Sequence, residues 1–256
     1  MSHYYDLEGN SRYTVPYADP KKGERPTTLR DAKKNNWVPS VTTIMQVAAK
    51  PGLDRWKRDQ LLEAAMEIEY CSWSDDPDVY KRQVVARSTQ KSEEAAKRGT
   101  ELHDALEQYY LTGELGKDKE FIEPAIQLID EHFTKIKWFP EESFAHRSGF
   151  GGKVDLYSTV TDGIYNYHYV LDFKTKSDSS KMKAYDEHRM QLAAYADGLG
   201  LYLPKTKYYN LFIGTQQPGE VLLIEHSPEE MHRARLMFYH LLRYWQQLNN
   251  YIPEFK

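Results

Sequence analysis

The spacing of apolar residues changes about halfway along the chain. Between residues 41 and 137 it repeats every three to four positions, as in amphipathic helices, and from residue 143 onward short apolar strand patterns alternate with two further helices. The predicted helices span residues 41–49, 53–69, 93–111, 119–137, 181–199 and 228–248, and the predicted strands include 143–147, 208–213 and 220–225. Two more strands surround Asp155 and Asp172. This order, helices followed by β-β-β-α-β-β-α, predicts an α/β fold with a mixed central sheet flanked by helices on both faces.

Several residues mark the predicted helix ends. Ser40, Ser92 and Ser227 are suited to accept hydrogen bonds from the first free amides of the helices that follow them. Pro51-Gly52 is expected to break the helical pattern, and Gly113 is expected to end one helix. An acidic loop is expected over residues 72–78.

The stretch from Gly149 to Lys174 contains two acids inside strand patterns. Asp155 lies in Lys-Val-Asp-Leu-Tyr, and Asp172 lies in Tyr-Val-Leu-Asp-Phe-Lys. Aspartate is disfavoured in strands and costly to bury, so both positions require a reason. Strand alternation puts Asp172 and Lys174 on one side and Phe173 on the other. Since the Thr161-Asp162-Gly163 turn lets the two strands pair, the acids predict a cradle for a divalent cation and an activated water.

Each of these residues also has a plainer interpretation. Asp172 and Lys174 could form an ion pair on an edge strand, although the apolar lead-in from Tyr169 to Leu171 argues against so exposed a location. Asp155 could cap a turn, although its flanking residues are typical of a strand. His103 lies four residues after Gly99 on the inner stripe of its predicted helix, where a single histidine is usually structural. Gln191 and Tyr195 are four apart on a helix, a pair that commonly just covers a helix face.

The amino-acid composition excludes several kinds of structural framework and metal site. The chain has 256 residues, a net charge of −4 and a single cysteine, Cys71, which excludes a disulfide framework, a cysteine-ligated zinc site and an Fe–S cluster within this chain. With no apolar signal core and no run of apolar residues long enough to span a bilayer, we expect a non-secreted protein in the cytoplasm of a bacterial or phage-infected cell, without membrane association. The 20 tyrosines are candidates for stacking on unpaired bases, although core packing is their default role.

Taken in order, these residues resemble the PD-(D/E)XK nuclease superfamily, in its RecB-like exonuclease branch. The resemblance covers residues 37–215 and is closest to cluster-free members, similar to phage-encoded exonucleases and the mitochondrial single-strand exonuclease. The matching pieces are Pro39 to Ile44 with Leu53 and Trp56, Arg98-Gly99-Thr100 with His103, Gly152 to Asp155, Asp172-Phe173-Lys174, and Gln191 with Tyr195. None of these pieces is specific alone, but their shared order is.

The resemblance implies a restriction-endonuclease-like core over residues 91–256, preceded by an extension and helical cap or arch over residues 1–90. Asp155, Asp172 and the backbone carbonyl of Phe173 would ligate one or two Mg²⁺ or Mn²⁺ ions, with His103 as a further ligand. An upstream acid of the motif would be Glu141 or Glu142.

The same resemblance implies roles for the remaining residues. Lys174 would position the attacking water and stabilise charge on the scissile phosphate. Gln191 would orient Lys174 or the metal site, and Tyr195 would either hold the adjacent DNA phosphate or buttress Gln191. Arg98, Lys176 and Lys181, together with Tyr195, are weak candidates for DNA binding, and a solvated charged surface explains the basic residues equally well.

The expected function is therefore a metal-dependent DNA exonuclease that hydrolyses phosphodiester bonds from DNA ends or single strands, in recombination, repair or replication. Two alternatives stay open: a structure-specific endonuclease, and a catalytically silent DNA-binding or partner-recruiting module of the same fold. The expected partner is DNA, as single strands or duplex ends, with a separate recombinase, single-strand-binding protein or helicase as a candidate protein partner.

Overall fold

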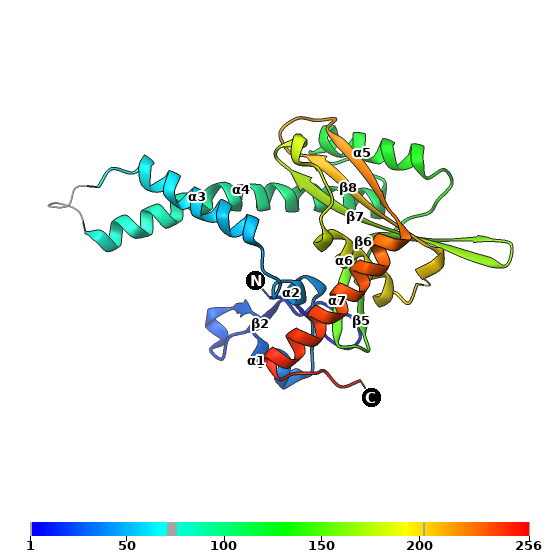
Figure 1. Ribbon diagram of the computed structural model, residues 1–256, viewed down its shortest axis with the longest axis horizontal. Helices are drawn as coiled ribbons and strands as arrows, with labels where there is room; N and C mark the ends of the chain where they lie inside the picture. Colours follow the sequence, from blue (N-terminus) through cyan, green and yellow to red (C-terminus); the bar gives the residue numbers. More distant parts are fainter. Residues whose placement is uncertain (1, 71–75, 202, 256) are drawn as a thin grey trace. The chain divides into compact units, whose positions relative to one another are not determined.

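The computed structural model describes residues 2–70, 76–201 and 203–255 (Figure 1). Cys71 and residues 72–75 of the predicted acidic loop lie outside these ranges. The chain divides into two compact units, one formed by residues 49–102 and the other by residues 1–48 and 103–256. The sequence-based boundary at residue 90 separates an extension from a nuclease core, a division by function that compactness does not test.

From residue 41 onward the elements follow the predicted order, and the short elements before it come in addition. The helices are α1 (Leu29–Asn35), α2 (Val41–Met45), α3 (Pro51–Glu67), α4 (Pro77–Thr112), α5 (Lys119–His132), α6 (Asp186–Gly198) and α7 (Pro228–Asn249). The strands are β1 (Tyr4–Tyr5), β2 (Thr14–Pro16), β3 (Glu24–Pro26), β4 (Val38–Pro39), β5 (Phe139–His146), β6 (Phe150–Asp162), β7 (Tyr165–Lys176), β8 (Thr206–Gly214) and β9 (Val221–His226). No helix in the described ranges combines the length and apolar character needed to span a bilayer.

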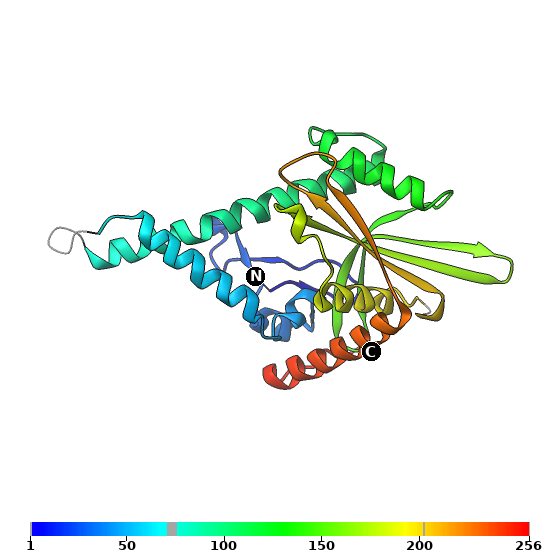
Figure 2. The same ribbon diagram turned by 45° about the horizontal axis from the view of Figure 1, so that its top comes forward.

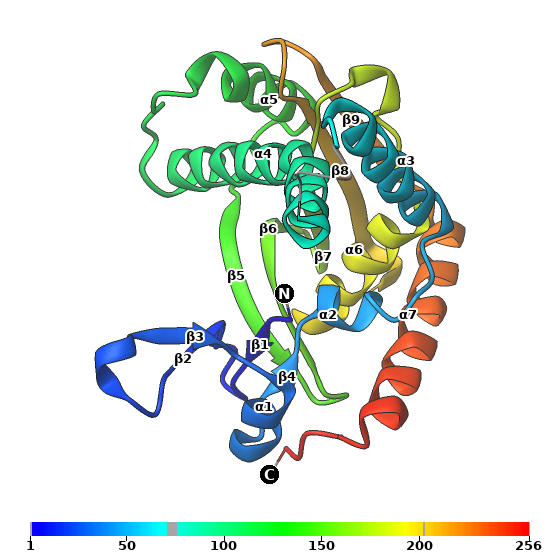
Figure 3. The same ribbon diagram turned by 90° about the vertical axis from the view of Figure 1, so that its left-hand side faces the viewer.

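The central sheet has five strands in the order β5-β6-β7-β8-β9 (Figure 3). Only the β7–β8 pair is parallel, and the other three pairs are antiparallel. The parallel pair requires a crossover, which α6 supplies between β7 and β8. The predicted mixed sheet is thereby confirmed. Figure 2 shows the β6–β7 hairpin extending past its neighbours. The pairing of β6 with β5 ends at Tyr157 and that of β7 with β8 at His168, whereas β6 and β7 stay paired as far as Asp162 and Tyr165.

Helices cover both faces of the sheet, as predicted. On one face, the ring of Tyr209 in β8 lies 4.8 Å from Phe133 at the end of α5. On the other, Phe212 of the same strand lies 5.7 Å from His188 of α6. Residues an odd number of positions apart in a strand point to opposite faces, so α5 and α6 sandwich β8. Every residue of β8 except Lys207 is buried.

Local chemistry explains where most helices begin. The Ser40 side chain accepts from the Thr43 amide at the start of α2. Ser227 and Glu230 form a reciprocal capping box at the start of α7, where Pro228 occupies the first turn. Helix α5 buries Ile122, Ile126 and Ile129, which form its apolar face. The predicted caps Ser40 and Ser227 are confirmed.

Several predicted helix boundaries differ from the structure: α2 ends at Met45 rather than 49, α5 ends at His132 rather than 137, and α6 begins at Asp186 rather than 181. Helix α4 begins at Pro77, so Ser92 lies inside a helix of 36 residues, and its hydroxyl donates to the carbonyl of Thr89 at 2.7 Å instead of capping. Between those positions the chain has no glycine or further proline, and serine tolerates a helix interior when it bonds to the preceding turn. Pro51 lies where α2 and α3 are separated, as expected, and it opens α3 near its first position, where its missing amide costs nothing.

Residues 1–48 belong to the same compact unit as the sheet. Strand β1 pairs with β4 in the register Tyr4–Pro39 and Tyr5–Val38, and Ser40 makes an isolated parallel bridge to Gly151 of β6. The N-terminal segment is therefore fastened to the strand that carries Asp155.

The second unit consists of α3 and residues 77–102 of α4 (Figure 1). The Tyr80 hydroxyl donates to the carbonyl of Ala65 at 3.2 Å, and Arg87 pairs with Glu67 at 2.8 Å. These contacts join the end of α3 to the first half of α4.

Phe144 of β5 shapes the packing next to the predicted site. A Cβ atom added to Gly152 of β6 would lie 2.8 Å from the Phe144 ring, and one added to Gly198 at the end of α6 would collide with the same ring. Only glycine leaves space for this ring at both positions. Phe144 thus fixes the distance between β6 and α6, the elements that carry Asp155 and Gln191.

Candidate active site

Asp172 lies in the middle strand of the sheet and is only 1% exposed. Its Oδ2 accepts from the ammonium of Lys174 at 2.6 Å and from Nδ2 of Asn210 at 2.8 Å. Because β7 has β6 on one side and β8 on the other, the interpretation of Asp172 and Lys174 as an edge-strand pair does not apply. A buried carboxylate with two donors is a fixed and costly group, typical of a site.

Asp155 lies where β6 and β7 separate. The last regular pair between these strands is Leu156 with Leu171, and Asp155 comes one residue beyond it. Its Oδ2 accepts the backbone N–H of Phe173 at 2.7 Å, which satisfies an amide that the diverging strands would leave unpaired. This bond ties Asp155 to the residue between Asp172 and Lys174.

His103 approaches the same place from α4. Its Nδ1 is 3.7 Å from Oδ2 of Asp155, and its ring stands edge-on to Phe173 with centroids 5.8 Å apart. The structure therefore brings the imidazole next to one of the two acids and next to the residue whose carbonyl was a candidate ligand.

Lys174 connects the strand acids to α6. Its ammonium donates to Oε1 of Gln191 at 3.1 Å, and Nε2 of Gln191 donates to the hydroxyl of Tyr195 at 2.7 Å. Since the same ammonium pairs with Asp172, these four side chains form one continuous chain of hydrogen bonds. Gln191 and Tyr195 share a helix face because they are four residues apart.

The surroundings shift two pKa values. Burial raises the pKa of Asp172 to about 6. The charge of Lys174 opposes this rise, repulsion from Asp155 adds to it, and the nearby His103 lowers the pKa. Burial also holds the pKa of Tyr195 well above its ordinary value, with the two aspartates adding to the effect. Tyr195 is therefore a neutral hydrogen-bonding group.

Two residues of this cluster escaped the sequence analysis. Asn210 of β8, fully buried, contacts Asp172, and Nε2 of His226 in β9 lies 2.8 Å from Oδ1 of Asn210. A signal was present, because Asn210 is a polar residue in the middle of the apolar segment Tyr208 to Ile213. Buried amides need hydrogen-bond partners, so a polar residue inside an apolar strand pattern indicates contact with another buried polar group.

Lys153, two residues before Asp155, gathers further acids. It forms an ion pair with Glu141 of β5 and lies 4.0 Å from Glu107 of α4. Glu141 has a φ of +58°, which is rare for a residue with a side chain and indicates a local distortion of β5. Of the two upstream acids considered from the sequence, Glu141 pairs with Lys153 through its side chain, and Glu142 lies opposite Val154 in the β5–β6 register.

Three basic residues were considered for DNA binding. Lys181 pairs with Asp178 at 2.9 Å and is largely exposed. The Lys176 ammonium lies 5.9 Å from the centre of the Tyr185 ring. Arg98 is 3.4 Å from Glu101 within the other compact unit. Their part in DNA binding stays a prediction.

The donor set suits a hard divalent cation. Carboxylate and carbonyl oxygens are the ligands that Mg²⁺ and Mn²⁺ prefer, and the repulsion that Asp155 exerts on Asp172 is the kind that a cation relieves. Within the described ranges, no three histidine, cysteine, aspartate or glutamate side chains form a group disposed to hold a metal. A cation here would therefore also need the Phe173 carbonyl, water or substrate oxygens.

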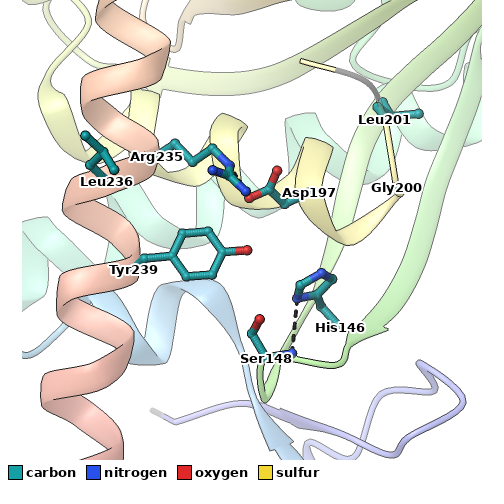
Figure 4. Close-up of a pocket in the computed structure, with 8 residues that line it drawn as sticks. All are labelled: His146, Ser148, Asp197, Gly200, Leu201, Arg235, Leu236 and Tyr239. Atoms are coloured by element: carbon teal, nitrogen blue, oxygen red, sulfur yellow. Dashed lines mark hydrogen bonds and ion pairs between the residues drawn. The ribbon is translucent and has the colours of Figure 1, made fainter.

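A cavity of about 640 Å³ elsewhere in the same unit shares no residue with this cluster (Figure 4). Its polar side chains contact one another: Arg235 donates to Asp197 at 2.7 Å and lies over the ring of Tyr239, 5.1 Å from its centre. Nδ1 of His146 accepts from the backbone N–H of Ser148 at 3.3 Å. These contacts join α6 to α7 next to the β5–β6 turn, so we assign them a structural role.

No protein-family model matches the sequence, and no curated protein matches it. Among solved structures, the chain is similar to an alkaline exonuclease from Laribacter hongkongensis, with a TM-score of 0.38 and 13% identity over 77% of this chain and 95% of that one. It is also similar to a protein designated SSO0001, with a TM-score of 0.30 and 15% identity over 74% of this chain and 86% of that one. Both TM-scores are low, so the function has to be argued from the residues of the site.

Proposed function

We propose that this chain is a metal-dependent deoxyribonuclease of the PD-(D/E)XK type, acting as an exonuclease on DNA ends or single strands. The observation that carries the proposal is the grouping of Asp155, Asp172 and Lys174. Asp155 is bonded to the amide of Phe173 at 2.7 Å, and Lys174 pairs with Asp172 at 2.6 Å. Two carboxylates and an ammonium around one backbone segment are the groups that metal-assisted phosphodiester hydrolysis needs.

Four groups of this chain would hold the cation: the carboxylates of Asp155 and Asp172, the carbonyl of Phe173 and the imidazole of His103. When bound, Mg²⁺ or Mn²⁺ would lower the pKa of a water and polarise the phosphate. His103 is half-buried and lies 3.7 Å from Asp155, which favours an auxiliary role beside the acids.

Lys174 would provide the positive charge next to the reacting phosphate. Its ammonium is held between Asp172 and Gln191, so its position is fixed before substrate arrives. A preorganised cation stabilises the extra negative charge of the transition state more effectively than a mobile one. Gln191 orients this ammonium, since its Oε1 accepts from Nζ.

For Tyr195, the geometry favours the buttressing role over phosphate binding. The ring is only 6% exposed, and its hydroxyl accepts from Gln191 at 2.7 Å. It also packs edge-on against Phe144, with ring centroids 6.1 Å apart. Tyr195 would therefore act on catalysis through Gln191 and Lys174.

The cost of this arrangement counts against a catalytically silent binding module. Burying Asp172 beside a second acid destabilises the fold, and a module that only binds DNA has no use for that cost. An apolar or neutral residue at position 172 would be more stable.

The proposal is tested by incubating the purified chain with end-labelled single-stranded and duplex oligonucleotides in Mg²⁺ or Mn²⁺. We expect shortening of the labelled DNA that EDTA abolishes, and a loss of at least about a hundredfold in Asp172→Ala and Lys174→Met. The matched control is Asp162→Asn, which removes an exposed acid from the same hairpin. Activity that persists in EDTA or in Asp172→Ala would contradict the proposal.

A covalently closed single-stranded circle separates the two modes of cleavage. An exonuclease needs an end and leaves the circle intact, whereas an endonuclease linearises it. Absence of cleavage of every substrate, with DNA binding retained, would favour the silent binding module.

A further inference from the structure

Asn210 occupies a position where its amide can adopt only one useful orientation. It lies directly beside Asp172 in the parallel register of β7 and β8 and has no exposed surface. Its Nδ2 donates to Oδ2 of Asp172 at 2.8 Å, so its Oδ1 points away from the carboxylate. The opposite orientation would place two negatively polarised oxygens against each other.

His226 selects that orientation. Its Nε2 lies 2.8 Å from Oδ1 of Asn210, and an amide oxygen can only accept, so Nε2 carries the proton and donates it. Its Nδ1 is buried with no partner among the described residues, as suits an unprotonated nitrogen. Burial lowers the pKa of His226 to about 4, with nearby Arg189 adding to the shift and Glu230 opposing it, so the ring is neutral.

We propose that Asn210 and His226 are positioning residues that hold the carboxylate of Asp172 in one orientation for cation binding. This inference rests on the proposed function, since it assigns Asp172 as a ligand. His226 fixes the amide of Asn210, and Asn210 in turn fixes Oδ2 of Asp172. Without the histidine donor, the amide is free to rotate and present its oxygen to the carboxylate.

The relay also divides the two oxygens of Asp172 between different tasks. Lys174 and Asn210 both donate to Oδ2, so Oδ1 is outside this pair of bonds. Hydrogen bonds to one oxygen restrict rotation of the carboxylate and pre-orient the other. Residues that hold a metal ligand in this way typically change metal affinity by about 10- to 100-fold when mutated.

Mn²⁺ binding, measured by calorimetry without DNA, tests the relay. We expect His226→Leu to bind Mn²⁺ about 10- to 100-fold more weakly than the wild type. His226→Gln, whose side-chain amide can donate from a similar position, should restore most of the affinity. The matched control is Leu211→Val, which loosens the same strand on its other face and should leave the affinity unchanged.

Nitrogen-15 NMR of the histidine side chains supplies a readout that needs no metal. We expect His226 to be the Nε2–H tautomer at neutral pH in the wild type. A protonated Nδ1 in the neutral ring would overturn the relay, as would unchanged Mn²⁺ affinity in a folded His226→Leu variant. A wild-type chain that binds no Mn²⁺ would overturn the proposed function together with the relay, which distinguishes the two failures.

Discussion

At the scale of single residues, Asp172 shows that a carboxylate can stay buried although its burial destabilises the fold. A carboxylate with 1% exposure loses nearly all of its hydration, and the shift of its pKa to about 6 reflects that loss. Two donors, Lys174 and Asn210, offset part of the penalty. The remainder is stability given up for a group that neither packing nor solubility requires.

Two other buried groups, the imidazoles of His188 and His226, make the stability of the fold depend on pH. Burial lowers the pKa of His188 to about 3, and the neighbouring charges of Lys174, Lys176 and Arg189 act in the same direction. Burial lowers the pKa of His226 to about 4. Nδ1 of His188 accepts the amide of Tyr185 at 3.2 Å at the start of α6, a bond that requires an unprotonated nitrogen.

These shifts predict that the fold loses stability as pH falls from about 6.5 toward 4. Above pH 6.5, both imidazoles are neutral in the folded and unfolded chain, so they contribute no pH dependence. Below it, the unfolded chain takes up protons that the folded chain does not, and each histidine costs about 1.4 kcal/mol per pH unit. Urea unfolding at pH 7 and pH 5 should therefore differ by about 2 kcal/mol for each of the two residues.

A histidine variant tests whether His188 causes its share of this pH dependence. His188→Gln should reduce the loss between pH 7 and pH 5 by about one histidine's share, whereas His240→Gln, at an exposed position, should leave it unchanged. An identical pH dependence in His188→Gln would show that this imidazole does not stay neutral in the folded state.

At the scale of elements, hydrophobic periodicity correctly predicted those segments whose local sequence preferences agree with their packing in the fold. Helix α7 has a capping box and an apolar face, and β8 is a run of apolar residues between turns, so both were found within about two residues. The start of α4 was missed because residues 77–91 have no strong apolar stripe, and Ser92 resembled a cap. Helical preference over a long stretch outweighed that local signal.

The site was predictable only in part, for a related reason. Asp155, Asp172 and Lys174 are conspicuous because charged residues in strand patterns need an explanation. Asn210 and His226 are not, since their significance depends on the parallel pairing of β7 with β8 and on the antiparallel pairing of β8 with β9. That register is a tertiary fact, and no spacing along the chain encodes it.

The packing between β5 and α6 predicts a strong effect for one glycine. Gly198→Ala would drive a methyl group into the ring of Phe144, which is buried and also contacts Tyr195. We expect a loss of about 1–3 kcal/mol in unfolding free energy, because overpacking displaces the ring. Activity should fall as well, since displacement of Tyr195 disturbs Gln191 and Lys174.

Two further variants check this steric explanation. Gly116→Ala adds a methyl group in open space and should be close to neutral. The double variant Gly198→Ala/Phe144→Leu should be more stable than the sum of the two single changes predicts, because the smaller side chain removes the collision. Additive losses would mean that the ring is not the obstacle.

At the scale of the whole molecule, the candidate site depends on the fold of one compact unit. Its residues come from α4, β6, β7, α6, β8 and β9, separated by up to 123 positions between His103 and His226. An unfolded chain cannot gather them, so a cation held by Asp155 and Asp172 would bind the folded state alone. Cation binding and folding are then thermodynamically linked.

That linkage predicts thermal stabilisation by Mn²⁺ or Mg²⁺ in the absence of DNA. At a concentration 100 times the dissociation constant, the folded state gains about 2.7 kcal/mol, which corresponds to a rise of about 5–10 °C in melting temperature for a unit of this size. Circular dichroism melts should show this rise in the wild type and in Asp162→Asn, and lose it in Asp155→Ala and Asp172→Ala. Sodium chloride at matched ionic strength controls for screening. A rise of equal size in the two alanine variants would place the stabilising ion elsewhere, and with it the chemistry, because a site built from these carboxylates cannot bind the cation without them.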